Sequence, residues 1–241
     1  MTTREILNDA GHRPWPMPKA PWKFYQEWNR AIFLHWEVDY DELKKLVPAN
    51  LEIDLIEGKP WVSLVAFTME KIRPRYLPAF KPISDFDEVN VRTYVKFANK
   101  TGVYFLSIEG GKKLSCQVAK SISQLPYRYS KITRSQNQYK THNAEFDDRL
   151  DIQFHIEESI EKKSVLDEWL TERYALFQDF GKAINAFDIQ HIQWPMNNIR
   201  VENLDVNYPR FKALFSGYPD KIHYSEGVQV IAWGKQKVLT Q

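Results

Sequence analysis

Hydrophobic and polar residues alternate most regularly over residues 86–97, where the side chains divide into two faces with a period of two. Four polar side chains, Glu88, Asn90, Arg92 and Tyr94, fall on one face, and mainly valines fall on the other. Alternation of this kind with β-branched residues predicts a β-strand. Its polar face is either solvated or the wall of an enclosed polar cavity, where burial would force the acid and the guanidinium to pair or to bind a ligand.

Weaker patterns of the same kind predict about ten strands along the chain. The others are expected at residues 24–38, 51–56, 61–69, 103–108, 150–156, 183–192, 199–206 and 228–233, with a polar hairpin within 127–142. Residues 57–60 contain glycine and proline, and they predict a hairpin turn between the two strands that flank them. Residues 73–85 contain three prolines, which predict a long loop.

Four short helices are expected, at residues 2–10, at 39–47, at 113–123 and from Ser164 to about Phe177. Ser164 followed by Asp167 is a capping pattern for the last of these helices. In the third helix, apolar residues recur every four positions from Leu114 to Ile122 and so share one face. Residues 1–22 carry four prolines and two tryptophans after the first helix, which predicts an extended arm packed against a single domain that spans residues 1–241.

Strands joined by short links, without regular βαβ alternation, favour an α+β protein that is mainly β. Its curved antiparallel or mixed sheets would curl or close into a barrel, with a few peripheral helices. A doubly wound nucleotide fold is disfavoured, because the sequence has neither a Gly-x-Gly-x-x-Gly pattern nor a phosphate-loop motif.

Composition removes several classes of function. The chain has 241 residues and a net charge of +2, a balance that argues against nucleic acid as an obligate partner. One cysteine cannot form a disulfide within the chain, and the six histidines lack metal-ligand spacing, so neither a metal site nor a cofactor is expected. The sequence has no apolar run of about 18 residues and no secretory signal, which predicts a cytoplasmic protein without a membrane span.

Three segments together resemble a known family. Residues 88–95 (Glu-Val-Asn-Val-Arg-Thr-Tyr-Val), 125–127 (Leu-Pro-Tyr) and 170–174 (Leu-Thr-Glu-Arg-Tyr) are similar to the YqjF-like, or DUF2071, family of uncharacterised bacterial proteins. The resemblance extends from about residue 14 to residue 206. That family is related to the acetoacetate decarboxylase-like fold, so the resemblance implies a closed, cone-shaped β-barrel around a central cavity.

The resemblance also bears on chemistry. In the decarboxylases, a helix end leads into Pro-Lys-Lys, and the first lysine forms a Schiff base with a β-keto acid. The matching stretch here is Pro126-Tyr127-Arg128, and a tyrosine cannot form an imine. The chain is therefore not expected to catalyse imine-based decarboxylation at the usual position, and the resemblance places Glu88 as the acid of the cavity.

These observations give a candidate site for a small organic acid or ketone. Its candidate catalytic residues are Arg92, which would hold a carboxylate, Glu88 as acid or base, Lys120 as the nearest amine, and Tyr127. The candidate ligand-binding residues are Asn90, Tyr94, Tyr104, Arg128, Arg173 and Tyr174. If the protein is an enzyme, lyase-like or other small-molecule chemistry is expected. The alternative is a non-catalytic ligand-binding or structural protein, and a homo-oligomer is compatible with either function.

Overall fold

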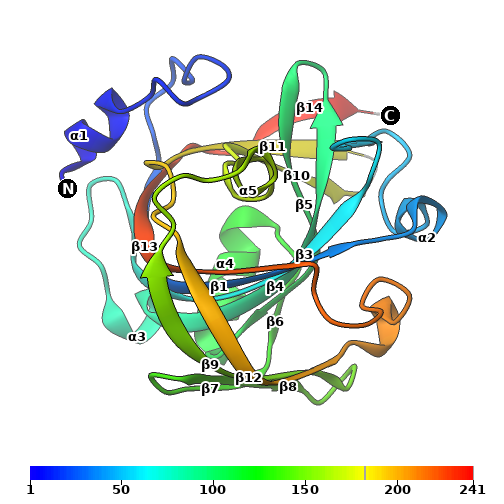
Figure 1. The fold of residues 1–241 in the computed structure, drawn as a ribbon. Helices are drawn as coiled ribbons and strands as arrows, with labels where there is room; N and C mark the ends of the chain where they lie inside the picture. The colour runs from blue at the N-terminus through cyan, green and yellow to red at the C-terminus, as the bar shows by residue number, and fades with distance from the viewer. Residues whose placement is uncertain (182, 241) are drawn as a thin grey trace.

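The computed structural model describes residues 1–181 and 183–240, and strands dominate it (Figure 1). The helices are α1 (Thr3–Asn8), α2 (Tyr40–Lys44), α3 (Lys81–Ser84), α4 (Lys113–Ser123) and α5 (Val165–Thr171), with a short 3-10 helix, η1 (Pro209–Phe211). The strands are β1 (Phe24–Glu37), β2 (Glu52–Ile53), β3 (Trp61–Pro74), β4 (Phe86–Phe97), β5 (Lys100–Gly110), β6 (Tyr127–Tyr129), β7 (Lys131–Arg134), β8 (Gln138–Asn143), β9 (Asp148–Ser159), β10 (Ala175–Phe180), β11 (Ala183–Gln190), β12 (Asn197–Asn207), β13 (Lys221–Ala232) and β14 (Gln236–Thr240). The prediction of a mainly β protein of the α+β class is confirmed.

The strands pair into one continuous sheet in the order β14-β11-β10-β5-β4-β3-β1-β13-β12-β9-β8-β7. Most pairs are antiparallel, whereas β10 and β6 each pair with β5 in parallel, so the sheet is mixed as predicted. A second pairing joins β13 to β11 through Ile189 with Ala232 and Gln190 with Ile231. Seven strands, β11, β10, β5, β4, β3, β1 and β13, are therefore paired in a closed circuit, because the last of them pairs with the first. Beyond β13, strands β12, β9, β8 and β7 lie together at the bottom of Figure 1.

Both faces of β4 are buried. Val89, Val91 and Val95 pack in a hydrophobic cluster that also contains Tyr139 of β8 and Ile152 of β9. The side chains of Glu88, Asn90, Arg92 and Tyr94 are each at most 8% exposed on the other face. The strand and its alternation are thus confirmed, and the solvated alternative for the polar face is wrong.

The helix that begins at Ser164 is shorter than predicted. Ser164 forms the capping box with Asp167, as expected, but α5 ends at Thr171. Residues 175–180 form β10, which pairs with β11. The run Ala175–Gln178 is buried on both faces, and periodicity cannot distinguish a short buried strand from a helix in such a run.

The expected hairpin at residues 57–60 is only partly present. The turn exists, because Ile56 and Lys59 form a backbone bridge with Glu57 and Gly58 at positive φ. Strand β2, however, pairs with β4 rather than with β3. The expected loop at residues 73–85 contains the end of β3 and the helix α3.

Helix α4 is present as predicted, but its apolar stripe faces outward. Leu114 and Ile122 are 51% and 54% exposed, whereas Ser115 and Cys116 are the buried residues of the helix. Cys116 packs against Gly110 so closely that a Cβ on Gly110 would lie 2.7 Å from the cysteine sulfur. A small residue at the end of β5 therefore allows α4 to approach the sheet.

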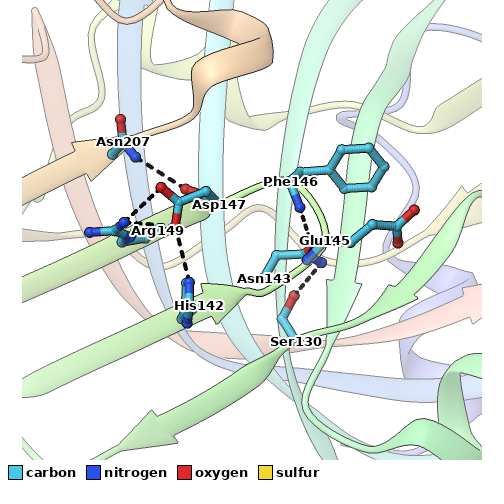
Figure 2. Close-up of polar contacts among 8 residues, drawn as sticks. All are labelled: Ser130, His142, Asn143, Glu145, Phe146, Asp147, Arg149 and Asn207. Atoms are coloured by element: carbon cyan, nitrogen blue, oxygen red, sulfur yellow. Dashed lines mark hydrogen bonds and ion pairs between the residues drawn. The ribbon is translucent and has the colours of Figure 1, made fainter.

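The turn between β8 and β9 is fastened by the buried side chain of Asn143 (Figure 2). Its Oδ1 accepts hydrogen bonds from the backbone N–H groups of Glu145 and Phe146, at 3.0 and 3.1 Å. Its Nδ2 donates to Ser130 Oγ at 2.9 Å. One amide side chain thus closes the turn and connects it to the segment between β6 and β7.

Replacing Asn143 by alanine is expected to lower the free energy of unfolding by roughly 1–3 kcal/mol, because buried polar partners lose their hydrogen bonds. His142→Ala in the same turn is the control, since the His142 side chain is half exposed and, among the described residues, bonds only Asp147. We expect that control to change stability by less than about 0.5 kcal/mol. Urea denaturation measures both, and equal losses would contradict this role of Asn143.

Candidate functional site

Three neighbouring strands bring His35, Ser63 and Arg92 side by side. His35 of β1 is opposite Ser63 of β3, and Ser63 is opposite Arg92 of β4. Residues that are directly opposite on adjacent strands point to the same face, so the three side chains form a row across the sheet. His35 and Ser63 are completely buried, and Arg92 is 8% exposed. The row joins the polar face of β4 to two strands whose contribution the sequence analysis did not foresee.

Hydrogen bonds determine which ring nitrogen of His35 carries the proton. Tyr94 OH donates to the carbonyl of Leu170 at 2.8 Å, so the Ser63 hydroxyl, 2.5 Å away, must donate to Tyr94. The 2.6 Å contact between Ser63 Oγ and His35 Nδ1 then requires the histidine to donate. Burial, with repulsion by His223 and Arg92, lowers the pKa of His35 well below its ordinary value. His35 is therefore neutral, and its Nε2 carries no proton and can only accept a hydrogen bond. This buried nitrogen has no partner among the described residues.

Glu88 is a buried acid with two donors. Its Oε2 accepts a hydrogen bond from Tyr127 OH at 2.8 Å, and its Oε1 accepts one from Asn90 Nδ2 at 3.2 Å. Burial raises the pKa of Glu88 to about 7, although both hydrogen bonds and the charge of Arg92 act in the opposite direction. The carboxyl group can therefore gain or lose a proton near neutral pH, which is the condition for a general acid or base.

Arg92 is a buried cation that forms no ion pair within the described residues, although Tyr94 and, to a smaller degree, Glu88 favour its charged form. No carboxylate of the described residues lies within ion-pair distance of it, and its Nε has no hydrogen-bond partner. Burial lowers the pKa of Arg92, but a guanidinium stays charged in a protein. The Asn90 Oδ1 atom is likewise buried and unpartnered in this part of the chain. The interior thus presents an unpaired cation, an unpaired amide oxygen and the bare nitrogen of His35.

The structure brings five of the ten predicted site residues together: Glu88, Asn90, Arg92, Tyr94 and Tyr127. The other five lie elsewhere or already have partners: Lys120, Tyr104, Arg128, Arg173 and Tyr174. Lys120 is exposed on α4. No lysine occurs among the buried residues of the part of the chain that is described. The expected amine of the site is therefore not positioned near Glu88.

Tyr104 and Arg128 lie on the opposite face of the sheet. Tyr104 OH donates to Asp179 at 2.6 Å. Arg128 follows Tyr127 in β6, so it points the other way, where it donates to Ser107 beside buried Glu109. Both were predicted as ligand-binding residues, and the alternation of strand faces separates them from Glu88.

Arg173 and Tyr174 are engaged in protein contacts. Arg173 NH1 pairs with Asp54 at 2.6 Å, and its guanidinium lies 4.2 Å from the ring centroid of Trp169. Tyr174 OH donates to Glu172 at 2.7 Å. Most of the polar atoms of these two residues are therefore engaged at the end of α5, and only NH2 of Arg173 is buried without a hydrogen-bond partner among the described residues.

Sequence reasoning missed a histidine pair next to this row. The rings of His35 and His223 are 5.5 Å apart, and His223 Nε2 lies 3.1 Å from Asp167 Oδ1. Asp167 also caps α5, so the helix cap and the histidine pair are linked. The alternation of residues 24–38 placed His35 on one face of its strand, but only the pairing of β1 with β13 brings it close to His223.

Two surface clefts, of about 810 and 490 Å³, open away from this cluster. The larger is lined by residues that include Arg30, Arg134 and Tyr224, and the smaller by Tyr104, Asp179 and others. Neither is lined by Glu88, Asn90 or Arg92. The polar cluster is thus enclosed by protein rather than exposed in either cleft.

Within residues 1–181 and 183–240, no helix is long and apolar enough to cross a membrane. The same residues contain no group of three or more His, Cys, Asp or Glu side chains placed to hold a metal ion.

The arrangement of strands defines an acetoacetate decarboxylase-like fold. The acetoacetate decarboxylase of Legionella pneumophila superposes with a TM-score of 0.66 at 13% identity, covering 98% of this chain and 95% of that one. A structure of the enduracididine biosynthesis enzyme MppR complexed with pyruvate superposes with a TM-score of 0.61 at 11% identity, covering 96% of this chain and 95% of that one. At such low identity the likeness establishes the fold alone.

The sequence itself gives the family. The model of the DUF2071 family, described as an uncharacterized conserved protein, matches residues 25–229. The "Uncharacterized protein YqjF" of Bacillus subtilis (strain 168) is 31% identical over 231 residues, which cover 92% of this chain and 95% of that protein. The chain belongs to the DUF2071 family, and the resemblance inferred from its motifs is confirmed.

The raised pKa of Glu88 makes a prediction for stability. Because the folded pKa of about 7 exceeds the ordinary value of 4.5, folding takes up a proton between these pH values. The stabilising contribution is fully present below the lower pKa and is lost as the pH rises through about 7. We expect the wild type to lose roughly 2–3 kcal/mol relative to Glu88→Gln between pH 5 and pH 8.

Urea denaturation of both proteins across this pH range measures the effect. The comparison with Glu88→Gln removes contributions from His35, His191 and His223, whose lowered pKa values act in the opposite direction. Parallel stability curves for the wild type and the variant would show that Glu88 titrates as an ordinary exposed acid.

Proposed function

We propose that the polar face of β4 binds a small carboxylic acid, whose carboxylate pairs with Arg92 inside a closed, cone-shaped barrel. The observation that carries this proposal is the buried guanidinium of Arg92, which forms no ion pair among the described residues and whose Nε has no hydrogen-bond partner there. Nearby Arg173, equally buried, has Asp54 as its counter-ion. Burying a cation without a partner is costly, and a ligand carboxylate would remove that cost through two charge-assisted hydrogen bonds.

The neighbouring groups favour an acid that carries a second oxygen. His35 Nε2 is a bare acceptor on β1, separated from Arg92 of β4 by the intervening strand β3, and Glu88 is both donor and acceptor near neutral pH. A hydroxyl group of the ligand could donate to His35, and a keto oxygen could accept from protonated Glu88. The fold supports the same class of ligand, because one structure of this fold is described as complexed with pyruvate.

The enclosure of the site is supported by two observations. The pairing of β13 with β11 connects the two ends of the strand path around this face. Trp194 and Met196 pack in a cluster with Phe33, Val65 and other residues on the same side of the sheet. Water would be largely excluded from such a site, which strengthens the attraction between a guanidinium and a carboxylate.

A thermal-shift series tests the proposal at pH 7, with pyruvate, 3-hydroxybutyrate and acetate compared with acetone, which lacks the carboxylate. Ligand at about 100 times its Kd stabilises a protein by about 2.7 kcal/mol. For a chain of this size, that corresponds to an increase in Tm of roughly 5–10 °C. We expect the acids with a second oxygen to give the largest increase and acetone to give none. If no carboxylic acid raises the Tm at millimolar concentration, the proposal is wrong.

A second candidate function is proton transfer next to the carbonyl group of a bound keto acid. It is favoured by the buried carboxyl group of Glu88, which lies beside Tyr127 and Asn90 and whose pKa burial raises to about 7. Exchange of the methyl protons of pyruvate in D2O, followed by proton NMR, measures this activity. We expect Glu88→Gln to slow the exchange by about 10²- to 10⁴-fold, the usual contribution of a general base. Exchange at the uncatalysed rate with the wild-type protein would leave ligand binding as the function.

Borohydride trapping of the wild-type protein tests whether any lysine forms a Schiff base with a keto acid. With no buried lysine in the described part of the chain, borohydride treatment with acetoacetate is expected to leave every lysine unmodified. Peptide mapping that finds an adduct on Lys120 or on another lysine would restore a Schiff-base mechanism.

A further inference from the structure

A cleft of about 810 Å³ lies at the beginning of β4, where Phe86 and Asp87 line it and Glu88 does not. Its lining residues include Arg30, Asp87, Lys112, Arg134 and Tyr224. Its volume is within the usual range for small-molecule sites. Because Asp87 and Glu88 are adjacent in a strand, they point to opposite faces, and the cleft is separate from the site proposed for Arg92.

A β-bulge directs Arg30 toward this cleft. The pairing of β1 with β3 shifts between Asn29 and Ile32, and Arg30 has a φ of 54° in the middle of the strand. On the partner strand, Gly227 has a φ of 130°, and a Cβ there would lie 2.4 Å from the carbonyl oxygen of Trp28. Bulges commonly redirect a side chain next to a functional site, and strained backbone is concentrated at such sites.

Arg134 approaches the cleft from β7. Its NH2 donates to the backbone carbonyl of Arg30, and its guanidinium lies 5.3 Å from the ring centroid of Tyr139. Its NH1 is buried and has no hydrogen-bond partner in the described chain. Burial lowers the pKa of Arg134, whereas Tyr139 and Asp87 act in the opposite direction and Arg30, a smaller cause, lowers it further. Arg134 therefore contacts the backbone of Arg30, and both arginines line the same cleft.

Within the described residues, neither arginine forms a close ion pair, although Asp87 attracts Arg134 from a longer distance. Arg30 lies 3.9 Å from Glu70, a long ion pair, and Arg134 forms none within the described residues. Asp87 already accepts a hydrogen bond from Thr68 at 2.7 Å. Like charges held side by side are unfavourable, and an anion between them would reverse the sign of the interaction.

The start of α4 adds further donors. Gly111 and Lys112 line the cleft, and Lys112 is the N-cap residue of this 11-residue helix without a side-chain cap. The first N–H groups of such a helix are available to an anion, which the helix dipole also attracts. Guanidinium groups and a helix N-terminus together suit a tetrahedral oxyanion, which can accept hydrogen bonds in several directions.

We propose that this cleft binds a small phosphorylated molecule, with its phosphate between Arg30 and Arg134 and beside the start of α4. The carboxylates of Asp85 and Glu226 also line the cleft. They would repel a bare polyanion and accept hydrogen bonds from hydroxyl groups, so the rest of the ligand is a polyol such as a sugar. This site does not depend on the function proposed for Arg92.

Isothermal titration in phosphate-free buffer at constant ionic strength tests the proposal, with inorganic phosphate and ribose 5-phosphate as probes. We expect both probes to bind, and ribose 5-phosphate to bind more tightly. Arg30→Gln and Arg134→Gln should each weaken binding at least tenfold. Arg200→Gln is the matched control, because Arg200 is an exposed arginine of β12, 3.8 Å from Glu157 and outside the cleft.

Arg134 also packs on Tyr139, so its replacement could disturb folding, and Tyr224→Phe provides a variant that keeps the ring in place. Tyr224 lies close enough to both arginines for their charges to lower its pKa, although burial, the largest cause, raises it. We expect Tyr224→Phe to weaken phosphate binding about threefold and Arg92→Leu to leave it unchanged. Absence of binding to the wild type, or equal binding by Arg30→Gln, would overturn the proposal.

Discussion

Replacing Arg92 by leucine is expected to weaken the binding of pyruvate or 3-hydroxybutyrate by about 10- to 100-fold, because hydrogen bonds to a charged group contribute roughly 1.5–3 kcal/mol. The same replacement is expected to leave the unliganded protein as stable as the wild type or more stable. Arg92 has no counter-ion among the described residues, so leucine removes a buried, unpaired charge. Loss of binding together with retained stability would distinguish a binding residue from a structural one.

Arg173 provides the matched control for this experiment. It is as buried as Arg92, but it pairs with Asp54. Arg173→Leu removes one of the two cations that pair with Asp54, since Lys96 remains at 2.9 Å, and should lower the free energy of unfolding by about 1.5–3 kcal/mol. Titration calorimetry and urea denaturation of the two variants measure both effects. If Arg92→Leu destabilises the protein as much as Arg173→Leu, Arg92 has a protein partner and the binding proposal loses its basis.

Asp188 is expected to have the second large effect, on stability. It accepts hydrogen bonds from Arg13 at 2.8 Å, from Trp15 Nε1 at 3.0 Å and from Lys100 at 2.7 Å. Asp188 and Arg13 are each 1% exposed at their side chains. Asp188→Asn would leave Arg13 buried without its counter-ion, which is expected to lower the free energy of unfolding by about 3–5 kcal/mol.

We propose on these contacts that the arm of residues 1–22 and the remainder of residues 1–241 unfold as one domain. Asp188→Asn should then lower the midpoint of a single urea transition and increase trypsin cleavage at Lys19 and Lys23. Asp151→Asn, which removes a half-exposed pair with Lys140, is the control and should change stability by less than about 1 kcal/mol. An early transition of the arm alone, with the main transition unchanged, would contradict the single-domain proposal.

The polar row of β4 could be predicted because it depends on one strand. Four polar side chains alternating with valines fix which residues share a face, whatever the strand pairs with. The burial of both faces required the tertiary structure, in which β8 and β9 cover the valines. The position of Tyr127 was predictable from the motif that it shares with the family, and its hydrogen bond to Glu88 was not.

His35 and Ser63 could not be placed from the sequence, because they join the site through the register of three strands. That register shifts at the bulge at Arg30, and a shift of one residue would turn His35 to the opposite face. Arg128 was misplaced for a related reason. Adjacent residues in a strand point to opposite faces, so Arg128 points away from the site into which Tyr127 points.

The binding of a ligand carboxylate by Arg92 inside the molecule is tested most directly by a crystal structure of the protein grown with saturating pyruvate. We expect electron density for the carboxylate about 2.7–2.9 Å from the guanidinium of Arg92, with the second oxygen near His35 or Glu88. An Arg92 side chain paired with a protein carboxylate, or turned to bulk water with no pyruvate beside it, would contradict this binding.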